Sequence, residues 1–238
     1  MTTGDGMKGA AGSYASPPCY MHELDPDFAG HPIDHVQAND VARWRKAERQ
    51  RLIAARLALN SDAREAHAGL IARDLDDIVR NTVNPIVSLY WPFRGEPDLR
   101  PWMTALHGQG VRVALPVVVA KGQPLIFRQW QPGAPLARGV WNIPFPADGV
   151  VVAPTIVIAP LVGFDQAGFR LGYGGGFFDR TLAARDPKPI AIGVGHPIGA
   201  VPTIFPQPHD IPMDWIVTGL APPRSYPRSI QTAGDDEQ

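Results

Sequence analysis

The sequence lacks a second cysteine, a marked excess of charge of either sign, and any long uninterrupted apolar run. Cys19 is the single cysteine, so no disulfide can form within the chain, and a reducing compartment, the cytoplasm, is the expected location. The formal net charge is −1, which favours neither nucleic acid nor an anionic membrane surface as a partner. The longest apolar region, 150–164, is interrupted by Pro154, Thr155 and Pro160. It therefore indicates a buried strand rather than a membrane span, which needs about 18 apolar residues.

Composition divides the chain into three parts. Residues 1–38 are rich in Gly, Ser, Ala and Pro and show no sustained apolar period, which predicts a mobile N-terminal extension. Residues 39–220 carry periodic apolar patterns, and a chain of 238 residues is long enough for one main domain with a sizeable core. The tail 221–238 is polar and contains prolines, so we expect it to fray.

The domain begins with two predicted helices and continues as alternating strands and helices. The first helix is expected from Asn39 or Asp40 to about Asn60, and the second starts at a cap formed by Ser61 or Asp62. Strands are expected at 86–90, 111–119, 125–130, 155–159, 190–194 and 215–217, and a helix from Pro97 to about His107 separates the first two. This alternation predicts an α/β domain in which helices cover a largely parallel sheet.

The most informative segment is 160–182, PLVGFDQAGFRLGYGGGFFDRTL, in which a glycine-dense turn follows an apolar strand and leads into a helix. Such a turn lets the backbone approach an oxyanion closely. Arg170 and Arg180 flank the turn and offer guanidinium groups to a phosphate, and Asp179 fits if a magnesium ion bridges it to that phosphate. No Lys-Ser/Thr pair follows the glycines, which excludes the standard P-loop. The alternative is a tight turn with Asp179 and Arg180 on a solvated helix face.

This segment resembles the signature of the 5-formyltetrahydrofolate cyclo-ligases, also called methenyltetrahydrofolate synthetases. The match consists of Phe164, Asp165, Gly168, Arg170, Leu171, Gly172, Gly174, Gly176, Phe177, Phe178 and Asp179. GVWNIPFP at 139–146, YWPFRGEPDLR at 90–100, LPVVV at 115–119 and PHDIPMD at 208–214 resemble further family elements in the family's order. The resemblance covers residues 43–220. It implies a three-layer α/β/α fold with a mostly parallel central sheet, similar to the sugar-phosphate isomerase/CoA-transferase-like fold.

The resemblance also implies an activity. Members use ATP and Mg²⁺ to cyclise 5-formyltetrahydrofolate to 5,10-methenyltetrahydrofolate, with release of ADP and phosphate, so ATP and the folate are the expected small-molecule partners. One alternative is a folate- or nucleotide-binding paralogue with little or no turnover. Another is a relative of the sugar-phosphate isomerases or CoA-transferases, because fold alone does not choose function. Against the latter, no motif places an enolising base.

Carried over residue by residue, the resemblance assigns site roles. Arg170 and Asp179 are the expected catalytic residues. The expected ATP-binding residues are Lys46, Arg49, Arg170, Gly172, Tyr173, Gly174, Gly175, Gly176, Phe177 and Asp179. The expected folate-binding residues are Glu96, Trp141, Phe177 and Phe178, and the expected magnesium ligands are Asp179 and Asp210.

Each of these roles has a structural alternative. The basic strip of Arg45, Lys46, Arg49 and Arg56 on the first helix is equally typical of a solvated face. Trp141 also suits a core position, Glu96 a solvent-facing loop, and Asp210 a turn before Pro212.

The chain departs from the family pattern inside the turn. Phe177 and Phe178 stand where many members have tyrosine, and Tyr173 and Gly175 stand where some members carry lysine or arginine. Two hydroxyl groups are thereby lost, and the charge of a bound phosphate must be compensated by Arg170 and the first helix.

Overall fold

The computed structural model describes residues 35–226. The chain divides into two compact units, Met1–Ala42 and Arg43–Gln238, and the description below concerns the second. Residues 1–34 and 227–238, which include Cys19 and most of both predicted terminal segments, lie outside the described part. Among residues 35–226, no helix combines the length and the apolar composition that crossing a membrane requires.

The first two helices follow each other with little between them. Helix α1 spans His35–Leu57, so it begins earlier than the predicted Asn39 or Asp40, and residues 35–38 are helical rather than part of the extension. Helix α2 spans Ser61–Arg80, and its N-cap is Asn60, not Ser61 or Asp62. The Asn60 side chain accepts a hydrogen bond from the Ala63 backbone N–H at 2.7 Å. Because Asn60 serves the second helix in this way, the first helix ends before it.

One mixed sheet forms the centre of the domain, and its strand order is β12-β11-β10-β7-β1-β2-β3-β6. The inner strands β11, β10, β7, β1 and β2 are parallel, whereas β12, β3 and β6 pair antiparallel at the two edges. The large, mostly parallel sheet expected from the sequence is therefore confirmed. The strands are β1 Ile86–Ser88, β2 Arg112–Val117, β3 Ile126–Trp130, β6 Val151–Val152, β7 Ile156–Pro160, β10 Ile190–Val194, β11 Trp215–Val217 and β12 Arg224–Ser225.

The β1–α3–β2 unit provides the predicted parallel crossover, but its helix starts later than expected. Helix α3 spans Arg100–Gly108 with a proline in its first turn, so Pro101 rather than Pro97 opens the helix. Pro97 is held in the preceding loop, where its carbonyl accepts a hydrogen bond from the Tyr90 hydroxyl at 3.0 Å. Asp98 also accepts from the Arg100 N–H at 3.0 Å. These local bonds keep residues 97–99 out of the helix.

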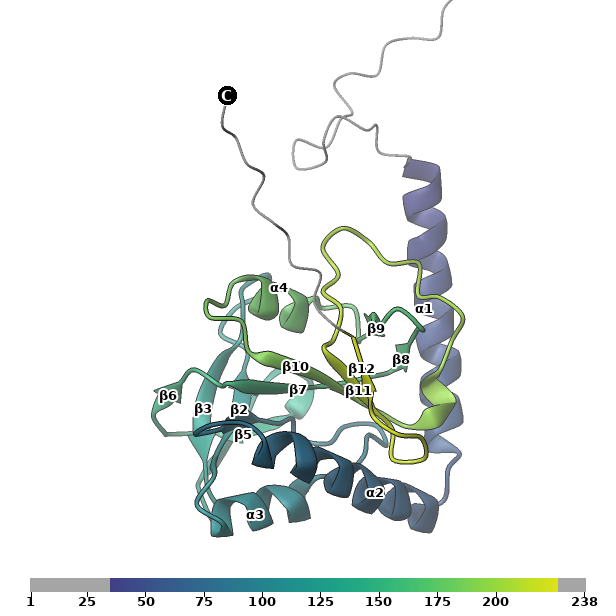
Figure 1. Ribbon diagram of the computed structural model, residues 1–238. Helices are drawn as coiled ribbons and strands as arrows, with labels where there is room; N and C mark the ends of the chain where they lie inside the picture. The colour runs from purple at the N-terminus through teal and green to yellow at the C-terminus, as the bar shows by residue number, and fades with distance from the viewer. Residues whose placement is uncertain (1–34, 227–238) are drawn as a thin grey trace, which may run out of the picture. The chain divides into compact units, whose positions relative to one another are not determined.

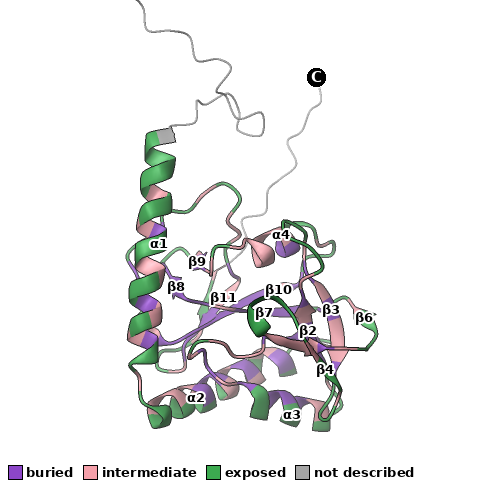
Figure 2. Ribbon diagram, turned by 180° about the vertical axis from the view of Figure 1, so that it is seen from behind, coloured by how far each residue is buried: buried purple, intermediate pink, exposed green. Residues whose placement is uncertain are grey.

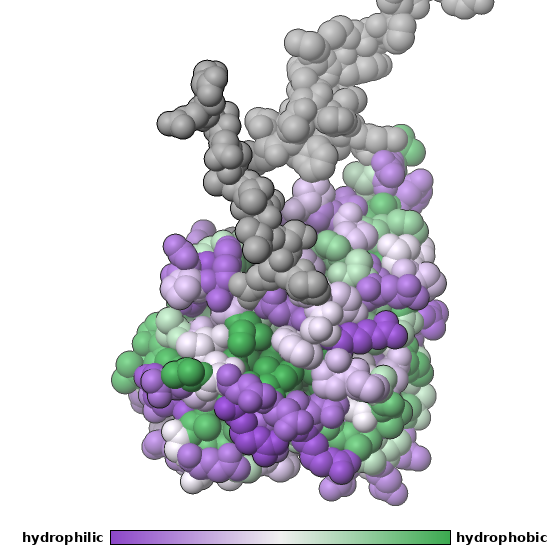
Figure 3. Space-filling model, viewed as in Figure 1, coloured by the Kyte–Doolittle hydropathy of each residue, from purple (hydrophilic) through white to green (hydrophobic). Residues whose placement is uncertain are grey.

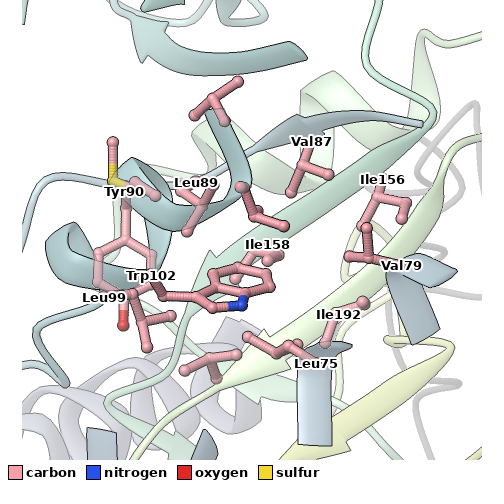
Figure 4. Packing of buried hydrophobic residues seen from close by; sticks show 14 of the residues in the cluster. Leu75, Val79, Val87, Leu89, Tyr90, Leu99, Trp102, Ile156, Ile158 and Ile192 are labelled. Atoms are coloured by element: carbon pink, nitrogen blue, oxygen red, sulfur yellow. The ribbon is translucent and has the colours of Figure 1, made fainter. Parts of the chain in front are cut away.

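Helices cover both faces of the sheet (Figure 1). Helices α2 and α3 pack on one face, where Leu75 and Val79 meet the apolar side chains of the central strands (Figure 4). Helix α4, Phe177–Ala183, packs on the other face with Leu182 against residues of β7, β10 and β11. Figure 2 shows the buried strands between these layers. Removing a side chain such as Ile158, which is fully buried, would cost about 2–5 kcal/mol.

In helix α2, the apolar residues at helical spacing are the buried ones. Its buried residues recur at helical spacing, namely Ala68, Ile71, Leu75 and Val79. Its other side is polar, and Figure 3 shows a hydrophilic band across the lower part of the face, where Figure 1 places this helix. One apolar stripe against the sheet with a polar outer side is the arrangement expected for a helix on the surface of an α/β domain.

Short irregular elements lie outside the main sheet. Strands β4, Leu136–Arg138, and β5, Pro144–Pro146, form a hairpin around the 3₁₀ turn η2, Val140–Asn142. Strands β8, Gly163–Phe164, and β9, Arg170–Leu171, form a second hairpin, and the 3₁₀ turn η3 spans Pro197–Gly199. Leu52 of α1 packs against Leu171 in a small separate cluster. That cluster ties α1 to the second hairpin.

The described chain ends in a strand rather than in a frayed tail. Strand β12 pairs antiparallel with β11, so the prediction of fraying from residue 221 is wrong for Arg224 and Ser225. The Tyr226 ring packs over Gly168 so closely that a Cβ atom there would lie 2.9 Å from it. Gly168 also has φ +84°, and both facts require glycine at this position.

Candidate active site

The glycine turn, residues 172–176, links β9 to α4 and is bordered by three arginines. The Arg49 Nε of α1 donates a hydrogen bond to the Gly172 carbonyl at 2.7 Å. A Cβ atom on Gly172 would lie 2.6 Å from a terminal nitrogen of Arg170, and one on Gly176 would lie 2.7 Å from a terminal nitrogen of Arg180. Gly176 also has φ +61°. Larger residues at these two positions would displace the guanidinium groups from the turn.

Two of these arginines keep unused hydrogen-bond donors. Arg170 is buried and its guanidinium group pairs with Asp179 at 2.7 Å, while Arg180 donates to the Gly175 carbonyl. Within the described residues, the buried Nε atoms of both Arg170 and Arg180 have no hydrogen-bond partner. Unsatisfied buried donors are costly and therefore uncommon. Their presence beside a glycine turn indicates a place that takes up an anion.

An aromatic ring supports each of these guanidinium groups. The Arg170 guanidinium carbon lies 5.4 Å from the Phe178 ring centre, and that of Arg180 lies 5.5 Å from the Phe177 ring centre. Both rings also pack on the hydrophobic cluster beneath α4. The structure thus gives Phe177 and Phe178 a clear role in placing Arg180 and Arg170. Direct contact of either ring with a folate or adenine stays a prediction.

The two predicted magnesium ligands differ in what holds them. Asp179 pairs with Arg170 through Oδ2, and its Oδ1 accepts only a long bond of 3.3 Å from the Ile211 N–H. Asp210 forms a salt bridge with Arg45 and accepts a hydrogen bond from the Gln207 N–H at 2.7 Å. The contacts of Asp210 favour the alternative of a residue that stabilises a turn. No group of three or more His, Cys, Asp or Glu side chains suited to a metal lies within residues 35–226.

The basic residues of α1 differ in their surroundings. Lys46 is exposed, whereas Arg45 is buried, with its guanidinium group bonded to the Ile204 carbonyl at 2.9 Å and to Asp210. Arg49 reaches the glycine turn as predicted, and Arg56 lies on the same side of the helix. Spacings of four and seven residues place Arg45, Arg49 and Arg56 on one face. Lys46, one residue away from Arg45, lies about 100° around the helix from it, and its contact with ATP stays a prediction.

Glu96 is buried beside the glycine turn and is not a solvent-facing loop residue. Its Oε1 accepts a hydrogen bond from the Tyr173 hydroxyl at 2.9 Å, and its Oε2 accepts from the Phe93 N–H at 2.9 Å. The Tyr173 hydroxyl in turn accepts a hydrogen bond from Arg56 at 2.6 Å. Burial raises the pKa of Glu96 to about 7, although Arg56, the Phe93 N–H and Tyr173 all lower it. A buried carboxyl group whose pKa is raised in this way is a candidate functional-site residue.

Three aromatic rings gather next to Glu96. The Trp141 ring is parallel to that of Phe93, with 6.2 Å between the ring centres, and lies 5.6 Å from that of Tyr173. Trp141 is 50% exposed and has φ +56°, so the alternative of a buried core residue is wrong. A bulky residue in the left-handed region is strained, and such strain is characteristic of ligand-contacting positions. The exposed part of Trp141 is available for stacking on a flat ligand.

The chain belongs to the 5-formyltetrahydrofolate cyclo-ligase family. A sequence model of that family matches residues 41–219, which agrees with the range 43–220 over which the resemblance was recognised. The matched range includes the glycine turn, α1 from Val41 onward, Glu96 and Trp141.

Individual relatives agree with this membership. The chain is 36% identical over 140 residues to the 5-formyltetrahydrofolate cyclo-ligase of Escherichia coli K12, a match that covers 56% of this chain and 76% of that protein. It is 31% identical over 140 residues to the cyclo-ligase of Haemophilus influenzae, covering 56% and 75% of the two chains.

Solved structures agree as well. The 5,10-methenyltetrahydrofolate synthetase of Aquifex aeolicus superposes with a TM-score of 0.67 at 25% identity, covering 81% of this chain and 99% of that one. The synthetase of Mycoplasma pneumoniae superposes with a TM-score of 0.61 at 20% identity, covering 74% and 98%, and supports the fold alone. The family predicted from the glycine-turn signature is therefore confirmed, and the chain is an enzyme of the cyclo-ligase class.

The main interaction that sequence reasoning missed in this cyclo-ligase is the contact of Tyr173 with Glu96 and Arg56. Tyr173 is predicted on the ATP side because it lies in the glycine turn. Its hydroxyl, however, contacts Arg56 and Glu96. The available sequence signal is that Arg56 lies seven residues after Arg49, which places both on the same face of α1. Two hydrogen-bond partners of Arg56, Tyr173 and Arg94, lie 117 and 38 residues away in the chain. No local pattern encodes such pairings.

Proposed function

We propose that this cyclo-ligase uses ATP and Mg²⁺ to close 5-formyltetrahydrofolate to 5,10-methenyltetrahydrofolate, with release of ADP and phosphate. The observation that carries the proposal is the junction at Tyr173. Its backbone belongs to the arginine-bordered glycine turn, and its hydroxyl contacts Glu96 beside the aromatic group. A site for an anion and a site for a flat polar ligand are therefore neighbours, as transfer of a phosphoryl group from one ligand to the other requires.

The chemistry assigned to the pair of substrates balances without a protein nucleophile. The γ-phosphoryl group of ATP passes to the formyl oxygen, and ADP leaves. The second amine nitrogen of the folate then attacks the formyl carbon and gives up its proton to solvent, and the C–O bond breaks to release phosphate. Enzymes that transfer phosphoryl groups act mainly by positioning and by charge stabilisation. The residues available for both tasks are Arg49, Arg170 and Arg180.

On the nucleotide side, the unused donors of Arg170 and Arg180 are suited to phosphate oxygens. Guanidinium groups bind phosphate in a planar, often bidentate geometry. Magnesium bound together with ATP takes one or two carboxylates and completes its shell with phosphate oxygens and water. Asp179 would hold it here, because its Oδ1 has only the long contact with Ile211. Bound magnesium would offset negative charge on the phosphates. Asp210 is not among the proposed ligands, because Arg45 and the Gln207 N–H already hold it.

On the folate side, Glu96 and Trp141 have complementary roles. A carboxylate accepts hydrogen bonds from the amino and ring N–H groups of a pterin, and both Glu96 oxygens are already oriented by the Tyr173 hydroxyl and the Phe93 N–H. Trp141 offers an exposed ring for stacking. The location of the protein in the cytoplasm stays a prediction from its single cysteine.

Direct assay of the purified protein tests this proposal. With 5-formyltetrahydrofolate, ATP and MgCl₂, we expect the absorbance of the methenyl product to rise together with ADP and phosphate in equal amounts. Leaving out ATP, or chelating Mg²⁺ with EDTA, should stop both signals. Binding of the folate without any product would refute the enzymatic proposal and support the alternative of a binding paralogue.

Asp179→Asn is the informative variant for the nucleotide side. Asparagine keeps the size of the side chain but loses its charge, so we expect turnover to fall at least about 100-fold, with a higher requirement for Mg²⁺. Alanine is the poorer choice, because deleting one partner of the buried Arg170–Asp179 pair would destabilise the fold by about 3–5 kcal/mol. Circular dichroism of the asparagine variant checks its folding. Unchanged turnover with normal Mg²⁺ dependence would contradict the role of Asp179.

A further inference from the structure

We propose that Tyr173 is a positioning residue of the folate side. Its hydroxyl orients the Glu96 carboxyl group and so links the phosphate-binding turn to folate recognition. The inference rests on the proposed function and goes beyond it, because the glycine turn as such serves the nucleotide. It assigns the backbone and the side chain of one residue to two different substrates.

Hydrogen bonds join Arg56, Tyr173 and Glu96 in a row, and both Arg56 and Glu96 have further hydrogen-bond partners. Arg56 donates to the Tyr173 hydroxyl at 2.6 Å, and that hydroxyl donates to Glu96 Oε1 at 2.9 Å. Arg56 is itself held by the Arg94 carbonyl at 2.9 Å and the Leu161 carbonyl at 3.2 Å. Because Arg56 can only donate, the hydroxyl accepts from it and directs its own proton toward Glu96. The other acceptor near this hydroxyl, the Phe93 carbonyl, lies farther away at 3.4 Å, so Glu96 is the closer partner for the proton.

The surroundings of the Tyr173 ring point the same way. Its ring centre lies 5.8 Å from that of Phe93 and 5.6 Å from that of Trp141. These are the rings next to Glu96, whereas the backbone of the turn is bonded to α1 through Arg49 and the Gly172 carbonyl. The hydroxyl is already engaged on two sides. The ring also packs on the cluster that contains Leu52 and Leu171. The Tyr173 hydroxyl and two of its ring contacts thus lie on the proposed folate side.

Charged and titratable groups surround Glu96 from several elements. Arg56 faces it from α1 and Tyr173 from the turn, while Tyr90 lies at the end of β1 and has a pKa raised well above 10 by burial. Asp98, on the same loop, pairs with Arg100, which lowers its pKa. His196 contacts the Gly95 carbonyl at 3.0 Å, and burial lowers its pKa to about 4.

Loss of the tyrosine hydroxyl should therefore be visible as a change in pH dependence. The hydrogen bond from Tyr173 stabilises the ionised form of Glu96 and lowers its pKa. In Tyr173→Phe that bond is absent, so the carboxyl group should hold its proton to higher pH. A hydrogen bond to a charged group corresponds to a shift of about one pH unit. The acidic limb of kcat/KM for the folate should move upward by that amount.

The experiment compares Tyr173→Phe with a matched control, Tyr226→Phe. Tyr226 is also a tyrosine with a buried hydroxyl, and that hydroxyl has no partner within the described residues. Kinetics are measured from pH 5.5 to 9 with each substrate varied in turn. For Tyr173→Phe we expect the acidic limb for the folate to shift upward and KM for ATP to change less than twofold. For Tyr226→Phe we expect both to match the wild type.

Binding measurements keep the test independent of turnover. The dissociation constant of 5-formyltetrahydrofolate, followed by tryptophan fluorescence across the same pH range, should show the same upward shift in Tyr173→Phe. An unshifted pH dependence, or a rise in KM for ATP without one for the folate, would overturn the inference. If the wild type binds the folate but forms no methenyl product, the proposed function fails, while the pH dependence of binding still decides the role of Tyr173.

Discussion

Glu96→Gln should make the protein more stable and less active at the same pH. Burial raises the pKa of Glu96 from 4.5 to about 7, so the folded state holds its proton more tightly than the unfolded chain. The stabilisation from this group is present below pH 4.5 and is lost as the pH rises through about 7. At about 1.4 kcal/mol per pH unit, ionised Glu96 costs the folded state about 3 kcal/mol at pH 8.5. Glutamine, which stays neutral, does not carry that cost.

The gain is reduced by the hydrogen bonds that glutamine cannot reproduce. Its amide nitrogen cannot accept a bond from the Tyr173 hydroxyl or from the Phe93 N–H, and the loss of one acceptor costs about 1 kcal/mol. We therefore expect Glu96→Gln to raise the free energy of unfolding by about 1–2 kcal/mol at pH 8.5. At pH 5, where Glu96 is itself protonated, the variant should be equal to the wild type or slightly less stable.

Urea denaturation at pH 5 and pH 8.5, followed by tryptophan fluorescence and circular dichroism, measures both values. Glu65→Gln is the matched control, because Glu65 is exposed on α2 and its neutralisation should have little effect at either pH. A difference between Glu96→Gln and the wild type that is the same at both pH values would refute the reasoning. The kcat/KM for the folate should meanwhile fall about 10- to 100-fold, because a charge-assisted hydrogen bond to the substrate is lost.

Two further predictions follow from the same region. Trp141→Ala should raise KM for the folate about tenfold and leave KM for ATP nearly unchanged, because stacking is lost; steady-state kinetics with each substrate varied measures both, and equal effects would instead indicate a general structural role. The low pKa of His196, about 4 against 6.5, means that its stabilisation is present above pH 6.5 and is lost as the pH falls toward 4, by about 3 kcal/mol. Urea denaturation of His196→Gln between pH 7 and pH 4.5 should show a flatter profile than the wild type, and identical profiles would exclude this source of acid sensitivity.

The sheet and its covering helices could be predicted because their signals are local. The apolar runs at β1, β7 and β10 are short and bounded by turn residues, and the stripe on α2 repeats at helical spacing. Errors concentrate at element ends, where single hydrogen bonds decide. Asn60 caps α2 and shortens α1, and the bond from Tyr90 to the Pro97 carbonyl delays α3. Strand β12 was missed because two residues in a polar tail give no periodic signal.

The candidate site was predictable where it is continuous in sequence. The glycine turn with Arg170 and Asp179 spans only ten residues from first to last, so its residue types alone indicate an anion site. The choice between Arg45 and Lys46 depends on helical phase, where one residue changes direction by about 100°. The contact of Tyr173 with Glu96 joins residues 77 positions apart. It depends on how the crossover connections fold back on one another, which no local pattern encodes.

Phenylalanine in place of tyrosine in the aromatic pair preserves the ring contacts of the two arginines beside the glycine turn. Phe178 and Phe177 face Arg170 and Arg180 at 5.4 and 5.5 Å, respectively. A guanidinium group is attracted to the face of an aromatic ring, and that face is present in phenylalanine as well as in tyrosine. The positions of both arginines, and with them the charge beside the glycine turn, are therefore maintained without the hydroxyl groups.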